Sequence, residues 1–235
     1  MRMFKKLILI SILGSCCNAL WAARPMITDD ARIVDEGSCQ VESWAKFNQN
    51  INEYWALPSC NIGGNFELTV GGAKAHGDTV DGGHWGLVQV QGKTLLRAPK
   101  TNDWSVGLAV GHVKNEANLI SPRMNDHYFY IPWTQSLRND GLFIHVNVGA
   151  SQKNDEKKYI PTAGLGMEFQ IAPNSYLIAE GFQDSSEKLA FQGGVRHWLI
   201  PQRAQIDMTI GNKGEWDRNN RWISIGIRLL SPKWY

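Results

Sequence analysis

The sequence has 235 residues, of which 23 are glycine and 10 are tryptophan, with 24 basic and 22 acidic residues. This length is enough for one domain that encloses an interior. The near-balance of charge gives no electrostatic reason to expect a nucleic-acid partner. Glycine with scattered aromatic residues is typical of a β-rich protein and argues against a helical one.

The first 22 residues have the pattern of an export signal. Three basic residues precede the apolar run 7–13, which is shorter than the roughly 20 residues of a membrane-spanning helix. We expect cleavage near Ala22 or Ala23, after which the formal charge falls from +2 to −1. An alternative is lipidation at Cys16, because the residues before it resemble a lipoprotein signal.

After the signal, short runs alternate apolar and polar residues with a period of two, and turn-rich breaks separate them. We expect a periplasmic segment over 23–38, followed by a β-barrel over 39–235. The twelve expected strands are Cys39–Phe47, Glu53–Pro58, Asn65–Lys74, His84–Leu96, Trp104–Val113, His127–Leu137, Leu142–Ala150, Tyr159–Ile171, Tyr176–Gln183, Leu189–Ile200, Ala204–Gly211 and Trp222–Leu230.

The breaks between these runs alternate between two lengths. One set, beginning with Asn48–Asn52 and including Lys114–Asp126, is longer and polar, whereas the alternate set, including Arg138–Gly141 and Ala172–Ser175, is mostly shorter. A barrel with long loops at one end and short turns at the other produces this rhythm. An even number of strands also places both termini at the short-turn end.

The two faces of each run differ in composition. In the last run Ile223, Ile225 and Ile227 alternate with Ser224 and Gly226. The polar face of the runs consists of small residues with isolated charges, which suits the inside of a narrow barrel whose aliphatic face contacts lipid. The sequence therefore predicts an all-β fold, a transmembrane antiparallel up-and-down β-barrel of about 12 strands (10–12) with short periplasmic turns and longer extracellular loops. A soluble β-sandwich is the alternative.

Five charged residues fall on the inward face of the expected barrel, namely Glu168, Glu180, Arg196, Asp207 and Arg228. Their mixed signs on adjacent strands indicate a paired network, because an unpaired charge away from water is costly. The network either braces a narrow lumen or lines the path of a solute and sets its charge selectivity. We treat these five residues as candidates for the lumen lining.

Two cysteines, Cys39 and Cys60, remain after the signal. The protein passes through an oxidising compartment, so an even pair predicts a disulfide. Both residues lie at the short-turn end of the first expected hairpin, where two β-carbons can approach bridging distance. Two unpaired thiols are the alternative, and a zinc site lacks a second pair of ligands.

The opening of the mature chain resembles a known family. Arg24-Pro25-Met26-Ile27-Thr28-Asp29-Asp30-Ala31 and Glu36-Gly37-Ser38-Cys39-Gln40-Val41-Glu42 are similar to the start of proteobacterial outer-membrane proteins that include the MetA-pathway phenol-degradation family of transporters. The resemblance implies an outer-membrane barrel that moves small hydrophobic or aromatic compounds. It implies no catalytic residues.

We therefore expect a non-enzymatic barrel in the bacterial outer membrane that acts as a channel or transporter for small solutes, with no cofactor and no metal. Its expected partners are outer-membrane lipids, lipopolysaccharide and the outer-membrane assembly machinery, which recognises a terminal aromatic residue such as Tyr235. A structural or interaction barrel without transport is the alternative. A lipid-modifying enzyme is a further one, for which the sequence offers His197 with serine candidates at Ser136, Ser185, Ser186 and Ser224.

Overall fold

A computed structural model describes residues 26–77, 84–115, 126–153, 158–183 and 188–234. The expected signal peptide over 1–22 and its cleavage site lie outside these residues, as do Cys16, Ser185 and Ser186. Among the described residues, no helix has the length and apolarity that a membrane-spanning helix requires.

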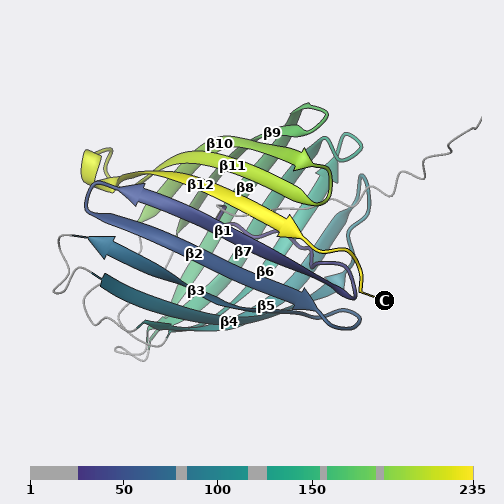
Figure 1. Ribbon diagram of the computed structural model, residues 1–235, viewed down its shortest axis with the longest axis horizontal. Coiled ribbons are helices and arrows are strands. Elements are labelled where there is room, and N and C mark those ends of the chain that lie inside the picture. The colour runs from purple at the N-terminus through teal and green to yellow at the C-terminus, as the bar shows by residue number, and fades with distance from the viewer. Residues whose placement is uncertain (1–25, 78–83, 116–125, 154–157, 184–187, 235) are drawn as a thin grey trace, which may run out of the picture.

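The described residues form twelve strands and one short 3-10 helix (Figure 1). All twelve runs of alternating residues seen in the sequence are strands, and their ends differ from expectation by a few residues. The strands are β1 (Ser38–Asn48), β2 (Ile51–Asn61), β3 (Glu67–Gly77), β4 (His84–Arg97), β5 (Trp104–Asn115), β6 (Asp126–Leu137), β7 (Leu142–Lys153), β8 (Lys158–Ala172), β9 (Ser175–Gln183), β10 (Leu189–Ile200), β11 (Ala204–Lys213) and β12 (Arg221–Leu230), and the helix is η1 (Arg218–Asn220).

Each strand pairs antiparallel with its neighbours in sequence, and β1 pairs with β12 to close the barrel. The closing seam is in register over nine residue pairs, from Gln40–Leu230 to Asn48–Trp222. Closure pairs both edges of the sheet, so these strands leave no open edge that would be costly in lipid. The predicted all-β, up-and-down antiparallel barrel of about 12 strands is confirmed.

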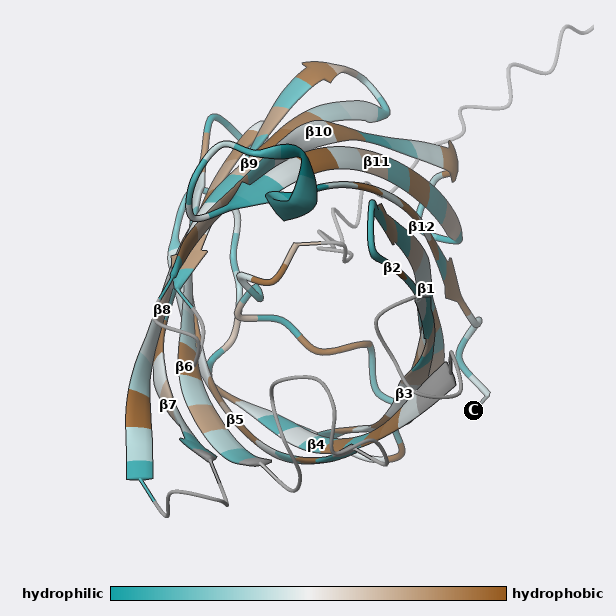
Figure 2. Cartoon of the chain, turned by 90° about the vertical axis from the view of Figure 1, so that its left-hand side faces the viewer, coloured by the Kyte–Doolittle hydropathy of each residue, from teal (hydrophilic) through white to brown (hydrophobic). Residues whose placement is uncertain are grey.

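Alternation along the strands separates an aliphatic exterior from a polar interior. In β12 the side chain of Ile225 is 51% exposed, whereas that of its neighbour Ser224 is 1% exposed. In Figure 2, apolar and polar residues alternate along the strands. The exposed side is aliphatic in the other strands too, which is the arrangement of a barrel surrounded by lipid. A soluble sandwich would bury this face.

The first hairpin joins β1 to β2 and differs from expectation at both ends. The break at Asn48–Asn52 was expected to be one of the long loops, but β2 begins at Ile51, so only two residues connect the strands. The side chain of Asn48 accepts a hydrogen bond from the Asn50 amide at 3.0 Å, and this local bond favours a tight turn.

Cys60 lies within β2 and not after it, directly opposite Cys39 of β1. The predicted disulfide joins the two residues, whose Cα atoms are 4.1 Å apart. The bond therefore links the two strands at the open end of the hairpin, which lies at the short-turn end of the barrel.

The segment before β1 corrects the expectation for residues 23–38. We expected a periplasmic segment, and left open whether side chains or residues 24 to 38 fill the lumen. In the described part, residues 26–34 run through the lumen, and Asp35 and Glu36 are exposed beyond it. In Figure 2, which looks along the barrel, this segment passes through the interior of the ring of strands. We call residues 26–37 the N-terminal strap. Met26, Ala31 and Val34 are among its buried residues.

Candidate functional site: the charged lumen and its N-terminal strap

The strap spans the lumen from one wall to the opposite wall. At one end the amides of Ile27 and Thr28 donate to the two carboxylate oxygens of Glu180 in β9, each at 2.7 Å. At the other end the Val34 amide donates to Oε2 of Glu67 in β3 at 2.8 Å. In a closed ring of twelve strands β3 and β9 lie on opposite sides. The strap is therefore fixed across the full width of the barrel by two carboxylates.

Further wall residues bind the strap between and beyond these anchors. The Ala31 amide donates to Thr134 Oγ1 at 2.9 Å, and this hydroxyl lies 2.9 Å from Nδ1 of His145. Asn61 donates its side-chain amide to the Val34 carbonyl at 2.9 Å. The strap has no regular secondary structure, so its buried backbone groups need such partners from side chains. The polar lumen supplies them.

Two glycines of β8 provide the space for the strap. A Cβ atom on Gly164 would lie 2.5 Å from Oγ1 of Thr28, and one on Gly166 would lie 2.6 Å from Cε of Met26. Real Cβ atoms do not approach other heavy atoms this closely, so a side chain at Gly164 would displace Thr28 of the strap, and one at Gly166 would require at least the end of the Met26 side chain to move. The small inward residues seen in the sequence thus match the path of this segment.

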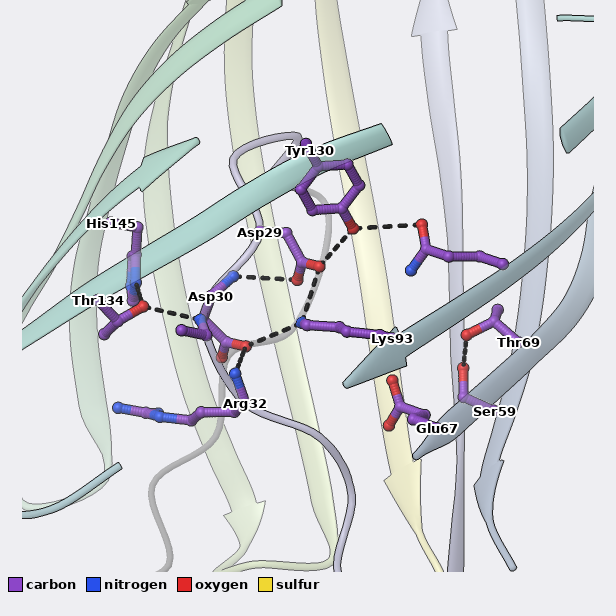
Figure 3. A network of polar contacts seen from close by, with 12 residues as sticks. Asp29, Asp30, Arg32, Ser59, Glu67, Thr69, Lys93, Tyr130, Thr134 and His145 are labelled. Carbon is purple, nitrogen blue, oxygen red and sulfur yellow. Dashed lines mark hydrogen bonds and ion pairs between the residues drawn. The ribbon is translucent and has the colours of Figure 1, made fainter. Parts of the chain in front are cut away.

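Lys93 of β4 forms ion pairs between the wall and the strap (Figure 3). Its Nζ lies 2.8 Å from Asp29 Oδ2 and 3.5 Å from Asp30 Oδ1. The hydroxyl of Tyr130 donates to the same Asp29 oxygen at 2.6 Å. One cation thus contacts two carboxylates of the strap. Lys93 and Glu67 are lumen residues beyond the five candidates expected from the sequence, although alternation with Gln89 and Gln91 places Lys93 on the inward face.

The structure brings three of the five lumen candidates together. Arg196 Nη1 lies 2.7 Å from Glu168 Oε2, and its Nη2 lies 3.8 Å from Asp207 Oδ2. His145 Nε2 is 3.1 Å from the other oxygen of Glu168. All four side chains are buried. The guanidinium of Arg32, on the strap, stacks over the ring of Phe143 at 4.4 Å, close to the same side of the lumen.

The other two candidates have separate surroundings. Glu180 anchors the strap and also accepts a hydrogen bond from Gln192. Arg228 donates to Gln40 and lies 3.8 Å from Glu42. Glu42 and Arg228 are direct partners in the β1–β12 register, so this contact joins the two strands of the closing seam.

A polar cavity of about 30 Å³ lies between the strap and the wall formed by β1 to β4. A volume of this size holds a water molecule or two. Four carboxylates and three cations are among its lining residues, namely Asp29, Asp30, Glu42, Glu67, Arg32, Lys93 and Arg228. Charges of both signs therefore surround the space that remains beside the strap.

Arg97 and Asp103 form an ion pair at the short-turn rim, outside the lumen. Arg97 Nη2 lies 2.5 Å from Asp103 Oδ2, and its guanidinium stacks over the ring of Trp104 at 3.9 Å. The Trp104 amide donates to the other Asp103 oxygen at 2.8 Å. This amide first, and then the Arg97 contact, hold the pKa of Asp103 below its ordinary value.

His197 lies on the exposed outer face near the same rim, and its Nδ1 is 2.9 Å from Ser175 Oγ, a contact that the sequence did not reveal. The two residues are cross-strand partners of β9 and β10. Serine hydrolysis also requires an acid that orients the histidine and donors for the oxyanion. Of the serines considered from the sequence, Ser136 bonds to Asp140 and Ser224 is buried in the lumen. The contact alone does not make a hydrolase site.

A family model described as "Uncharacterised conserved protein UCP029691" matches residues 10–230. The chain belongs to this family. The match covers nearly the whole described barrel and the strap. A search of curated proteins finds no match, and the resemblance of the opening motif to the MetA-pathway phenol-degradation family is not confirmed.

Solved structures of similar fold are outer-membrane barrels. The KdgM porin, solved in complex with disordered oligogalacturonate, has a TM-score of 0.63 at 9% identity, with 81% of this chain and 98% of the porin covered. The COG4313 outer-membrane channel from Pseudomonas putida F1 has a TM-score of 0.61 at 10% identity, with 86% and 98% covered. The NanC porin has a TM-score of 0.57 at 9% identity, with 81% and 98% covered. Together with the aliphatic exterior, the shared fold is that of a bacterial outer-membrane β-barrel.

Proposed function

We propose that the protein is an outer-membrane channel for small polar solutes, with the charged lumen as the path and the N-terminal strap as its constriction. The observation that carries the proposal is the composition of the lumen. Ionised and amide side chains line the interior, while the aliphatic residues face outward. A barrel that served only as a scaffold could fill its interior with apolar side chains.

The chemistry of the lining favours polar over aromatic solutes. The resemblance of the opening motif implies hydrophobic or aromatic cargo, but the cavity beside the strap is bordered by seven charged residues, with Leu57, Ile33 and Val34 as its aliphatic members. A hydrophobic solute would make few apolar contacts on this wall. It would also displace water from charged side chains, which is costly. The mixed signs of the charges support weak charge selectivity.

The strap limits the size of what passes. The cavity beside the strap, of about 30 Å³, is large enough for water. Release of the strap from its anchors at Glu67 and Glu180 would widen the path for larger solutes. The proposal therefore separates a small conductance in the strapped state from a larger one when the strap is released.

Conductance in planar lipid bilayers tests the proposal. We expect small stepwise openings from the full mature chain, and several-fold larger ones from Glu67→Ala/Glu180→Ala, which removes both anchors. Glu215→Ala, at an exposed residue outside the strands, is the control and should conduct as the parent does.

Refolded protein of each variant is first shown to be folded by a different migration on gels before and after heating. If the folded parent and the folded double variant both fail to conduct, the channel is rejected and the structural or interaction barrel becomes the better explanation. If vesicles containing the double variant admit an aromatic solute but exclude a sugar of similar size, the polar-solute assignment is rejected.

A further inference from the structure

The outer face of the barrel carries two lysines close to its long-loop end. Alternation in β3 exposes Lys74, three residues before that strand ends, and alternation in β5 exposes Lys114, one residue before its end. Nearer the middle of the bilayer the same faces present aliphatic residues such as Val70 and Val110. A lysine on the lipid face is costly at the bilayer centre and nearly neutral at the interface. The positions of both lysines therefore correspond to the headgroup level.

The register brings the two lysines near one another. Lys74 is opposite Gly86 and Lys114 is opposite Val88. Gly86 and Val88 are two residues apart on the same face of β4. The two lysines thus lie on either side of β4, and the positions they face on it are two residues apart.

Three histidines extend the same area. His76 follows Lys74 by two residues and is exposed on the outer face. His112 precedes Lys114 by two residues, and its ring centroid lies 4.5 Å from that of His127, its partner on β6. We call these five residues the outer basic patch. The ammonium groups of the two lysines can donate hydrogen bonds to an anion, and the histidines place imidazole rings beside them.

We propose that the outer basic patch binds the phosphate groups of lipid A, the membrane anchor of lipopolysaccharide. The long loops mark the extracellular end of the barrel, and the lipid of the outer leaflet there is lipopolysaccharide. Lysine and imidazole donors form charge-assisted hydrogen bonds with phosphate, and the long lysine side chains reach from the wall to the headgroups. The aliphatic residues beneath the patch contact the acyl chains of the same molecule.

Lipid A binding to the refolded full-length mature chain in detergent tests the proposal, with native mass spectrometry as the readout. Lys74→Gln/Lys114→Gln removes two charges from the patch, and Lys100→Gln/Lys233→Gln removes two exposed charges outside the patch, one of them in the short β4–β5 turn. Near a charged membrane surface each lysine contributes a factor of about five, so we expect the patch variant to bind bisphosphorylated lipid A roughly 10- to 30-fold more weakly. The control should bind as the parent does.

Two further measurements test whether binding depends on the phosphate groups of lipid A and on the positive charge of the patch. Lipid A that lacks both phosphates should bind the parent as weakly as bisphosphorylated lipid A binds the patch variant, and Lys74→Arg/Lys114→Arg should retain tight binding. Equal affinity for phosphorylated and dephosphorylated lipid A would overturn the proposal. An equal loss in the patch and control variants would overturn it too, because it would show only an effect of net charge. Heat-dependent migration confirms that each variant is folded.

Discussion

Lys93 shows at the scale of one residue how the strap depends on the wall. Its side chain is 4% exposed, and it is 2.8 Å from Asp29 and 3.5 Å from Asp30. Burying an ammonium group is costly unless an opposite charge is close and well placed. Here the partners belong to a segment more than 60 residues away in sequence, so the contact forms only when the strap is in the lumen.

We expect Lys93→Met to lower the free energy of unfolding by about 3–5 kcal/mol, because the Asp29 and Asp30 carboxylates would lose the cation that contacts both of them. Urea unfolding in lipid vesicles, followed by tryptophan fluorescence, measures the change. Lys46→Gln is the control, since Lys46 pairs with Glu53 at 3.3 Å but its side chain is 33% exposed, and we expect a loss below about 1 kcal/mol. Similar losses in both variants would show that Asp29 and Asp30 do not depend on Lys93.

The inward candidates illustrate what the sequence could supply at this scale. Alternation alone places Glu168, Arg196 and Asp207 on one face, and the strand register then makes Arg196 and Asp207 direct partners. The role of Glu180 could not be predicted in this way. Its carboxylate binds amides more than 150 residues earlier in the chain, and no local pattern encodes such a contact.

At the scale of elements, strands and strap differ in how much the sequence reveals. A strand with one face in lipid and one in the lumen must alternate, so its pattern is visible wherever it lies. The strap has no repeating pattern, because its residues contact different strands at irregular intervals. The composition of Ile27–Val34 is compatible with a solvated segment, and only the positions of Gly164 and Gly166 reveal the space reserved for it.

Hydrogen–deuterium exchange can measure how firmly Glu180 holds the strap. In Glu180→Ala the amides of Ile27 and Thr28 lose their acceptor, and hydrogen bonds to a charged group contribute about 1.5–3 kcal/mol each. We therefore expect these two amides to exchange at least roughly tenfold faster than in the parent. Amides within β9 should keep their protection, because the strand ladder does not use this side chain. Unchanged exchange at Ile27 and Thr28 would mean that other contacts hold the strap.

At the scale of the whole molecule, the decisive property is the medium that surrounds the barrel. The closed ring has a seam between β1 and β12 with the Glu42–Arg228 pair on its inner side. Its exterior is aliphatic at mid-height. Water and lipid differ in how the cost of a charge on this exterior depends on its depth.

Two exterior positions with equal exposure make this difference measurable. Ile225 lies in the middle of β12 and Tyr54 lies near the long-loop end of β2, and each side chain is 51% exposed. In a bilayer, arginine at mid-height costs about 2–4 kcal/mol, whereas near an interface it costs about 0–1 kcal/mol. We expect Ile225→Arg to lower the unfolding free energy in lipid vesicles by the larger amount and Tyr54→Arg by the smaller one.

Measuring the unfolding free energy of the same two variants in detergent micelles as well as in vesicles separates the effect of the bilayer from that of the substitution itself. A detergent micelle adapts around a charge more readily than a bilayer does, so the difference between the variants should shrink in detergent and persist in lipid. If both positions accepted arginine equally in lipid vesicles, the aliphatic belt would not be in contact with the hydrocarbon core. The charged lumen would then not be a path through the membrane, because such a path requires the membrane to surround this belt.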